Sequence, residues 1–208
     1  MNRLLRSALQ AGVIWTAELA AASDAGTLNV RIYNYAEVPE PTLVAAQAET
    51  GQIFHEAGIK VLWLPCATSD AEFAKSPHKF TACAQATGAV TLRIQSKSLG
   101  GQALRSHSWL AAAQKEQVEV FYDRLRQFAA DQNCKSRSIL ALVMAHELGH
   151  LLLGEQSHSS RGIMVPKLRT QEIRRAQKGQ LLFTPEQAQQ MREHQTRFLE
   201  RPGMPRPY

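Results

Sequence analysis

Three ionisable residues interrupt a stretch of the sequence that is otherwise almost entirely apolar. The stretch 138–153 reads Ser-Ile-Leu-Ala-Leu-Val-Met-Ala-His-Glu-Leu-Gly-His-Leu-Leu-Leu, and its ionisable residues are His146, Glu147 and His150. A helix that is apolar on nearly every face belongs in the centre of a protein. A carboxylate and two imidazoles buried there are strongly destabilising without partners, so we expect a metal ion to stabilise them.

The spacing of these residues indicates how a metal ion would be held. His146 and His150 are four positions apart, so both imidazoles lie on one face of a helix and can bind a single ion. Glu147 is rotated by about 100° around the helix, which keeps its carboxylate off the ion and beside a bound water molecule. This HExxH pattern is typical of two zinc ligands with a general base for a zinc-activated water. A pair of core histidines bonded to backbone carbonyl groups is the alternative.

A third ligand must come from outside this helix, because a catalytic zinc ion takes three protein ligands and keeps one position for water. Gly154 directly follows the apolar stretch and suits the left-handed conformation that ends a helix and turns the chain. His158 comes four residues after Gly154. The chain between these two residues can span about 13 Å, which is enough for His158 to return to the ion. A carboxylate on the following helix, Glu172, is the alternative third ligand.

The segment His146–Pro166 resembles the metzincin clan of zinc peptidases, whose motif is HExxHxxGxxH followed by a methionine turn. The match is partial, since Gly154 and His158 come one and two positions later than that motif places them. Met164 and Pro166 are closer to the pattern: matrix metalloproteinases have a similar Met-x-Pro at this offset, and archaemetzincins have a methionine there. The cysteines that follow the third histidine in archaemetzincins are absent from this sequence.

This resemblance implies a zinc-dependent peptidase, specifically an endopeptidase, that hydrolyses bonds in a peptide or protein substrate. It implies Zn²⁺ as the cofactor. The ligands would be three imidazoles, those of His146, His150 and His158. The resemblance also implies that Glu147 is the general base, that Met164 lies beneath the metal ion, and that Gly154 supports the site by turning the chain.

Two other functions fit the same residues. A related hydrolase would use Glu172 as a carboxylate ligand in place of the third histidine. A zinc-binding module without catalytic activity would keep the helix but no longer cleave. Glu147 argues against this second alternative, because a structural zinc site has no use for a base and usually fills its fourth position with protein.

The elements around the apolar helix alternate between strands and helices. Alternating or apolar runs predict strands at Leu28–Tyr35, Lys60–Leu64, Ala89–Ile94 and Val118–Tyr122. Helical spacing and capping residues predict helices at Thr42–Ala57, after Tyr122 to near Ala130, and from Thr184 to near Leu199. The segment between Cys66 and Cys83 and the segment at Gly100–Gly101 are expected to be loops. We therefore predict an α+β, zincin-like fold: a mixed sheet with a backing helix, a central buried active-site helix and a helical C-terminal part.

Length and composition limit the class of protein. The chain has 208 residues, which suits one domain, predicted at residues 26–208. No apolar run reaches the ~18 residues that span a bilayer, so we expect no membrane span. The net charge of +6 is modest and no basic stripe with interleaved aromatic residues accompanies it, so we expect no nucleic-acid partner.

The N-terminus and the cysteines bear on the cellular compartment. A basic start, the mildly apolar run Ala8–Ala17 and the small residues Ala20–Ser23 outline a secretory leader over residues 1–25. We therefore expect an exported protein, periplasmic or extracellular, and a cytosolic protein with a frayed N-terminal helix is the alternative. An oxidising compartment would allow a Cys66–Cys83 disulfide with Cys134 left over, whereas a reducing one would leave three thiols.

The remaining histidines and one basic cluster are weaker candidates for a site. His107 lies in a segment that would face a cleft, where it could contact substrate. The other residues are interpreted as surface positions: His55, His78 and His194, and the basic helix face of Arg174, Arg175 and Lys178.

Overall fold

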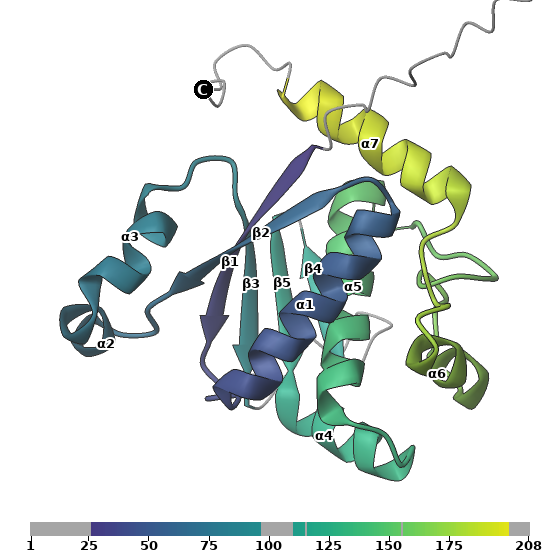
Figure 1. Cartoon of the computed structure of the whole chain (residues 1–208), viewed down its shortest axis with the longest axis horizontal. Helices are drawn as coiled ribbons and strands as arrows, with labels where there is room; N and C mark the ends of the chain where they lie inside the picture. Colours follow the sequence, from purple (N-terminus) through teal and green to yellow (C-terminus); the bar gives the residue numbers. More distant parts are fainter. Residues whose placement is uncertain (1–25, 97–109, 115, 155, 200–208) are drawn as a thin grey trace, which may run out of the picture.

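The computed structural model describes residues 26–96, 110–114, 116–154 and 156–199. Within these residues the strands form one mixed sheet in the order β2-β1-β3-β5-β4 (Figure 1). The strands are β1 (Thr27–Asn34), β2 (Lys60–Cys66), β3 (Val90–Gln95), β4 (Ala111–Gln114) and β5 (Gln117–Phe121). Neighbouring strands are parallel except for β4, which runs antiparallel to β5 at the edge of the sheet.

Strand β1 illustrates why this sheet buries one face. Its residues Leu28, Val30 and Ile32 are at most 6 % exposed, whereas the residues between them are half-buried. Because side chains alternate across a strand, this period of two places the apolar residues together on one face. In the neighbouring strand β3, Leu92 and Ile94 are fully buried with the same period. The parallel strands therefore present one apolar face to the helices.

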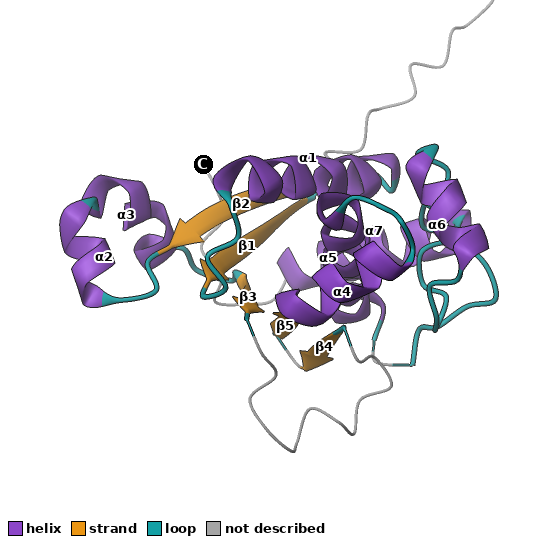
Figure 2. Cartoon of the chain, turned by 90° about the horizontal axis from the view of Figure 1, so that it is seen from below, coloured by secondary structure: helices purple, strands orange, loops and turns teal. Residues whose placement is uncertain are grey.

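Helices α1 (Glu40–Glu56) and α5 (Ser136–Leu153) lie side by side on one face of the sheet (Figures 1 and 2). Their approach is close enough for the hydroxyl of Thr50 in α1 to lie 3.2 Å from the backbone carbonyl of Ala141 in α5. Thr50 is fully buried, and its hydroxyl also lies 2.8 Å from the carbonyl of Ala46. The core thus forms between the sheet and α5, with α1 packed beside α5.

The remaining helices of this part of the chain are α4 (Tyr122–Asp131), α6 (Thr170–Gln177) and α7 (Pro185–Leu199). The predicted fold class is confirmed, with a mixed sheet, the backing helix α1, the buried helix α5 and a helical C-terminal part. Helix α1 begins two residues earlier than predicted. The reason is that Pro41 falls in its first turn, where the missing backbone N–H is not needed.

One sequence prediction about the connecting segments is incorrect, and one strand was missed. The segment between Cys66 and Cys83 is not a loop, because it contains helices α2 (Asp70–Lys75) and α3 (Pro77–Gln85). These helices are too short to show a clear apolar period, and they depend on local features such as the Ser69 side chain, which accepts the Glu72 N–H at 3.2 Å. Strand β4 was not predicted, because its run of alanines has no alternation and its pairing with β5 defines it. The segment at Gly100–Gly101 lies outside the described residues.

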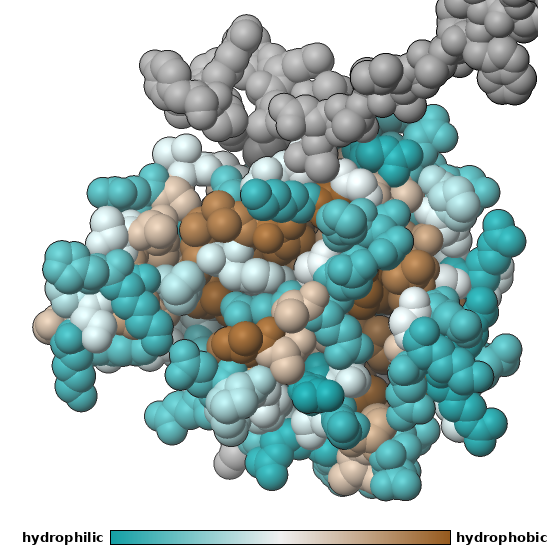
Figure 3. Space-filling view, viewed as in Figure 1, coloured by the Kyte–Doolittle hydropathy of each residue, from teal (hydrophilic) through white to brown (hydrophobic). Residues whose placement is uncertain are grey.

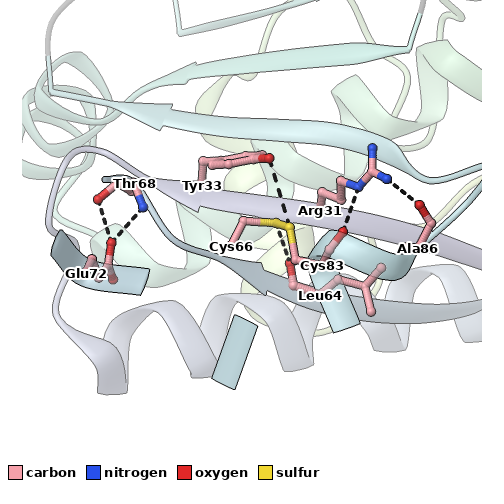
Figure 4. Close-up of a disulfide and its surroundings, with 8 residues drawn as sticks. All are labelled: Arg31, Tyr33, Leu64, Cys66, Thr68, Glu72, Cys83 and Ala86. Atoms are coloured by element: carbon pink, nitrogen blue, oxygen red, sulfur yellow. Dashed lines mark hydrogen bonds between the residues drawn. A yellow bond between two sulfur atoms is a disulfide. The ribbon is translucent and has the colours of Figure 1, made fainter. Parts of the chain in front are cut away.

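A disulfide holds the α2–α3 hairpin against the sheet (Figure 4). Cys66 at the end of β2 is bonded to Cys83 in α3, with the two Cα atoms 5.4 Å apart. The pairing is the one expected from the sequence. Arg31 in β1 adds to it, because its guanidinium donates to the carbonyl of Cys83 at 3.2 Å and to the carbonyl of Ala86. Helix α3 is therefore attached to both β1 and β2.

Hydrophilic side chains cover most of the face shown in Figure 3, with smaller apolar areas between them. Large apolar side chains that are exposed within the described residues are Tyr35, Val44, Leu62 and Phe73. None of the helices described combines the length and the apolar character needed to cross a membrane.

Removal of the disulfide is expected to destabilise the fold. The bonded cysteines are 17 positions apart, and closing a loop of this length stabilises a protein by about 3 kcal/mol through the unfolded state. We predict a loss of that size for a variant with Cys66→Ser and Cys83→Ser, measured by urea unfolding. Cys134→Ser is the control, since Cys134 is a free thiol. An unchanged unfolding midpoint in the double variant would contradict the prediction.

Candidate metal centre

Helix α5 carries the candidate site and is buried except along one edge. Residues 139–145 are all buried, as are Glu147, Leu148 and Gly149. His146 and His150 are half-buried, so the edge of the helix that bears them is the part that reaches the surface. Apolar packing thus fixes the backbone of α5 while leaving the two imidazoles accessible to a ligand.

The two imidazoles of α5 direct one nitrogen each at a common point. The Nε2 atoms of His146 and His150 lie 3.1 Å apart. A zinc ion bound by two nitrogens at about 2.05 Å in tetrahedral geometry separates those nitrogens by about 3.3 Å. The observed spacing therefore fits two ligands of one ion.

The tautomer of His146 is fixed by the backbone. Its Nδ1 lies 2.8 Å from the carbonyl oxygen of Ile163, which can only accept a hydrogen bond, so the proton of the neutral ring is on Nδ1 and the lone pair is on Nε2. Burial lowers the pKa of His146 to about 4; the bond to Ile163 opposes this shift, while His150 and His158 add to it. The ring is therefore neutral at physiological pH, the form that binds a metal.

His150 is oriented in a similar way by the turn that follows α5. Its Nδ1 lies 3.1 Å from the hydroxyl of Ser157 and 3.3 Å from the carbonyl oxygen of Gly154. Donation from Nδ1 to the Gly154 carbonyl leaves the lone pair on Nε2, as in His146. Two lone pairs that face each other at 3.1 Å repel, and a cation between them converts this repulsion into coordination. The donor set thus fits a metal ion.

Gly154 ends α5 in a conformation that other residues rarely adopt. Its φ of 98° and ψ of 161° combine a positive φ with an extended ψ. The sequence predicted a positive φ here, but in the left-handed helical region. The Gly154 N–H donates to the carbonyl of His150 at 2.8 Å, and the Gly154 carbonyl accepts from Ser157 at 3.3 Å. The chain is therefore turned back across the end of the helix.

This turn brings His158 to the two histidines of α5. Ligand atoms of the three imidazoles all lie within 4.8 Å of one another. The His158 ring centroid is 5.3 Å from that of His146 and 4.7 Å from that of His150. His158 is exposed, so the cluster is open to solvent on its side. Three protein nitrogens with one open side is the arrangement of a catalytic zinc site.

The two glutamates considered from the sequence lie outside this cluster. Glu147 is 3 % exposed, and neither it nor any other carboxylate of the described residues belongs to the group of possible ligand atoms. Glu172 accepts the backbone N–H of Arg169 at 3.1 Å, and so caps the start of α6. The structure therefore does not bring Glu172 to the histidines.

Met164 packs against α5 directly at the motif. Its side chain is fully buried, and a Cβ atom added to Gly149 would lie 2.8 Å from the Met164 sulfur and 2.8 Å from Cε1 of Phe183. Gly149 stands immediately before His150 in the sequence. The absence of a side chain at Gly149 is therefore what allows Met164 and Phe183 to approach the helix between the two histidines.

The segment that carries Met164 is held by backbone hydrogen bonds. The Ser159 N–H donates to the carbonyl of Met164 at 2.9 Å, and the Ile163 N–H donates to the carbonyl of Leu182 at 2.9 Å. Gly162 has a φ of 78°, and a Cβ atom there would lie 2.7 Å from the carbonyl oxygen of Leu182. The turn thus requires glycine at this position.

A hollow of about 690 Å³ opens beside His158. One wall is formed by the segment after α5 and the other by the start of α7. The lining residues include Gln156, Ser157 and His158 on the first wall, and Thr184, Glu186 and Gln187 on the second. The hollow gives an extended ligand room to approach the third histidine.

Solved structures of zinc peptidases share this architecture. A zinc-dependent peptidase from Methanocorpusculum labreanum (strain Z) matches with 12 % sequence identity and a TM-score of 0.50, over 78 % of this chain and 99 % of that chain. Archaemetzincin from Methanopyrus kandleri matches with 12 % identity and a TM-score of 0.51, over 82 % of this chain and 96 % of that chain. This chain therefore shares the fold of these two structures. Comparison with protein-family models and with curated proteins finds no match.

Among the described residues, the weaker candidates from the sequence do not join the cluster. His55, His78 and His194 are exposed, as are Arg174, Arg175 and Lys178 at α6. His107 lies outside the described residues. Ser157 and the backbone of Ile163, which orient the imidazoles, were not predicted from the sequence, and neither was the packing of Met164 against Gly149. Only the position of Gly149 inside the motif could have signalled a close approach.

Substitution of Gly149 by alanine is expected to destabilise the protein at the position next to His150. The new methyl group would overlap Met164 and Phe183, and overpacking of this kind destabilises a protein by about 1–3 kcal/mol. Urea unfolding of Gly149→Ala measures the loss. Gly51→Ala in α1 is the matched control, because a Cβ there meets nothing within 4 Å and should stabilise the helix by about 0.5–1 kcal/mol. Equal stabilisation by both substitutions would show that the approach of Met164 is not tight.

Proposed function

We propose that this protein is a zinc-dependent endopeptidase. The observation that carries the proposal is the convergence of three imidazoles, with two Nε2 atoms 3.1 Å apart and the Nδ1 atoms of the same rings engaged elsewhere. The shared fold supports it, because the solved structures with that fold are described as a zinc-dependent peptidase and an archaemetzincin. The substrate would be a peptide or protein.

Different residues of the site would have different roles in hydrolysis. His146, His150 and His158 would hold the zinc ion. Zinc, when bound, polarises the carbonyl of a peptide bond and lowers the pKa of a water molecule. Glu147 would take a proton from the attacking water and pass it to the amine that leaves. Its position next to His146 in the sequence, off the ligand cluster, suits this role.

The open side of the cluster favours cleavage within a chain. His158 is exposed, and the hollow beside it extends from the segment after α5 to the start of α7. An extended peptide can lie in such a hollow with residues on both sides of the bond that is cleaved. This geometry supports an endopeptidase.

The alternative functions receive less support. A carboxylate ligand from Glu172 is disfavoured because this side chain caps α6. A zinc-binding module that does not cleave would have no use for Glu147, a carboxylate buried next to a metal ligand. We therefore favour catalysis by the three-histidine site.

We also propose that the protein is exported. The N-terminal sequence outlines a secretory leader, which lies outside the described residues. The disulfide between Cys66 and Cys83 supports the same proposal, because such bonds persist in oxidising compartments.

Replacement of Glu147 by glutamine tests the catalytic role. We predict that Glu147→Gln binds one zinc ion per chain like the wild type but loses about 10²-fold or more in peptide hydrolysis, because the amide cannot accept the proton. Zinc content by mass spectrometry and cleavage of a peptide library measure the two effects. Equal cleavage by the variant would remove Glu147 from the mechanism, and wild-type protein that binds zinc without cleaving any peptide would favour the non-catalytic alternative.

A comparison of His158 and Glu172 tests the ligand set. We predict that His158→Ala weakens zinc binding by at least about 100-fold, because loss of even an outer partner of a ligand costs 10- to 100-fold. Glu172→Ala should leave zinc affinity nearly unchanged, since this carboxylate caps α6. Competition with a chelator measures both dissociation constants. The opposite ranking would favour a carboxylate third ligand.

A further inference from the structure

Gln187 in the first turn of α7 makes more contacts than its place in that turn requires. Its side chain is 8 % exposed. The Oε1 atom accepts the backbone N–H of Thr184 at 3.0 Å, and the Thr184 hydroxyl accepts the backbone N–H of Gln187 at 3.3 Å. These two bonds form a reciprocal cap of the helix. The Nε2 atom is not part of the cap, and it donates to the hydroxyl of Ser159 at 3.1 Å.

Ser159 connects this contact to the candidate metal centre. It directly follows His158, and its N–H donates to the carbonyl of Met164 at 2.9 Å. Its hydroxyl donates to the carbonyl of Arg161 at 2.7 Å, which commits the one hydroxyl proton. The hydroxyl oxygen is then an acceptor for Gln187. Ser159 thus closes the loop 158–164, and Gln187 fixes that loop to α7.

The amide of Gln187 suits this link better than a carboxylate would. A glutamate at this position would cap the helix equally well, because it accepts the Thr184 N–H in the same way. It would have no proton to donate to Ser159, and the Ser159 hydroxyl could donate to the carboxylate only by giving up its own hydrogen bond to the Arg161 carbonyl. The amide of Gln187 is therefore needed for the bond to the loop 158–164 and not for the cap of α7.

His158 differs from the other two histidines in its place in the fold. His146 and His150 are carried by the buried helix α5. His158 lies outside that helix, is exposed, and follows the turn at Gly154. Its distance from the other two rings therefore depends on how the loop is held.

We propose that Gln187 is a positioning residue for the third zinc ligand. By holding Ser159, it keeps the backbone of His158 at the distance from α5 at which three imidazoles share one ion. Ordering a ligand before the ion arrives removes an entropic cost from binding, so the link raises zinc affinity. This inference rests on the proposed zinc site and names the part of the chain that completes it.

Gln187→Glu separates the link from the cap. The full-length variant keeps the cap and is expected to remain folded, to unfold at a somewhat lower urea concentration because one hydrogen bond is lost, and to bind zinc about 10- to 100-fold more weakly. Competition with a chelator measures the dissociation constant. Ser159→Ala should weaken zinc binding similarly. The double variant should lose no more zinc affinity than the single variant with the larger loss, because both substitutions break the same hydrogen bond.

Gln195→Ala is the matched control for an effect through stability alone. Gln195 is on the same helix and is 5 % exposed, and its side chain packs against Gly26. Loss of stability without loss of zinc affinity is expected for this variant. Binding of Co²⁺ gives a second readout, since its visible absorption reports coordination geometry. The spectrum of Gln187→Glu should differ from wild type, and that of Gln195→Ala should not.

The outcomes separate this inference from the proposed function. If wild type binds zinc and Gln187→Glu binds it equally tightly with an unchanged Co²⁺ spectrum, the positioning role is wrong while the zinc site stands. The role is also wrong if Gln195→Ala weakens zinc binding as much as Gln187→Glu. If wild type binds no zinc, the proposed function itself fails.

Discussion

The structure depends on one constraint: α5 must be buried along most of its length and open along one edge. Leu140, Met144 and Leu148 are fully buried between the sheet and the neighbouring helices, which leaves the backbone of α5 no freedom to shift. The same packing leaves His146 and His150 half-buried. The fixed backbone places the two side chains on one edge, and the partners of their Nδ1 atoms orient the rings so that the Nε2 atoms lie close together.

The rest of the site is supplied by the segment that follows α5. Within a few residues this segment provides a ring close to the other two, a hydroxyl for His150, a carbonyl for His146 and a sulfur that packs against Gly149. It has little regular structure of its own, and it is held in place by a backbone hydrogen bond from Ile163 to Leu182 and by backbone hydrogen bonds within the segment. This segment therefore contributes to the site directly, in addition to connecting α5 to α6.

Much of this organisation could be predicted from the sequence, because it follows from local patterns. The alternation in β1, the apolar character of α5 and the four-residue spacing of its histidines each determine structure within one element. The pairing of Cys66 with Cys83 was also expected, although the helices between them were not, since their signals are a few capping residues. The general class of fold followed from these elements together.

The parts that could not be predicted depend on contacts between distant segments. The carbonyl of Ile163 orients His146, and a backbone carbonyl leaves no mark in the sequence. Strand β4 is defined by its partner, and the choice between His158 and Glu172 depended on the path of the chain after Gly154.

The path of the chain after Gly154 also shows why the residue spacing of such a site can vary. The turn at Gly154 sets the direction in which the chain leaves α5, and the hydrogen bond between Ser159 and Gln187 holds the chain just after His158. The number of residues between these two points can therefore change while the imidazole stays in place. Searches for metal sites by fixed spacing would miss chains of this kind, whereas searches for converging imidazoles would find them.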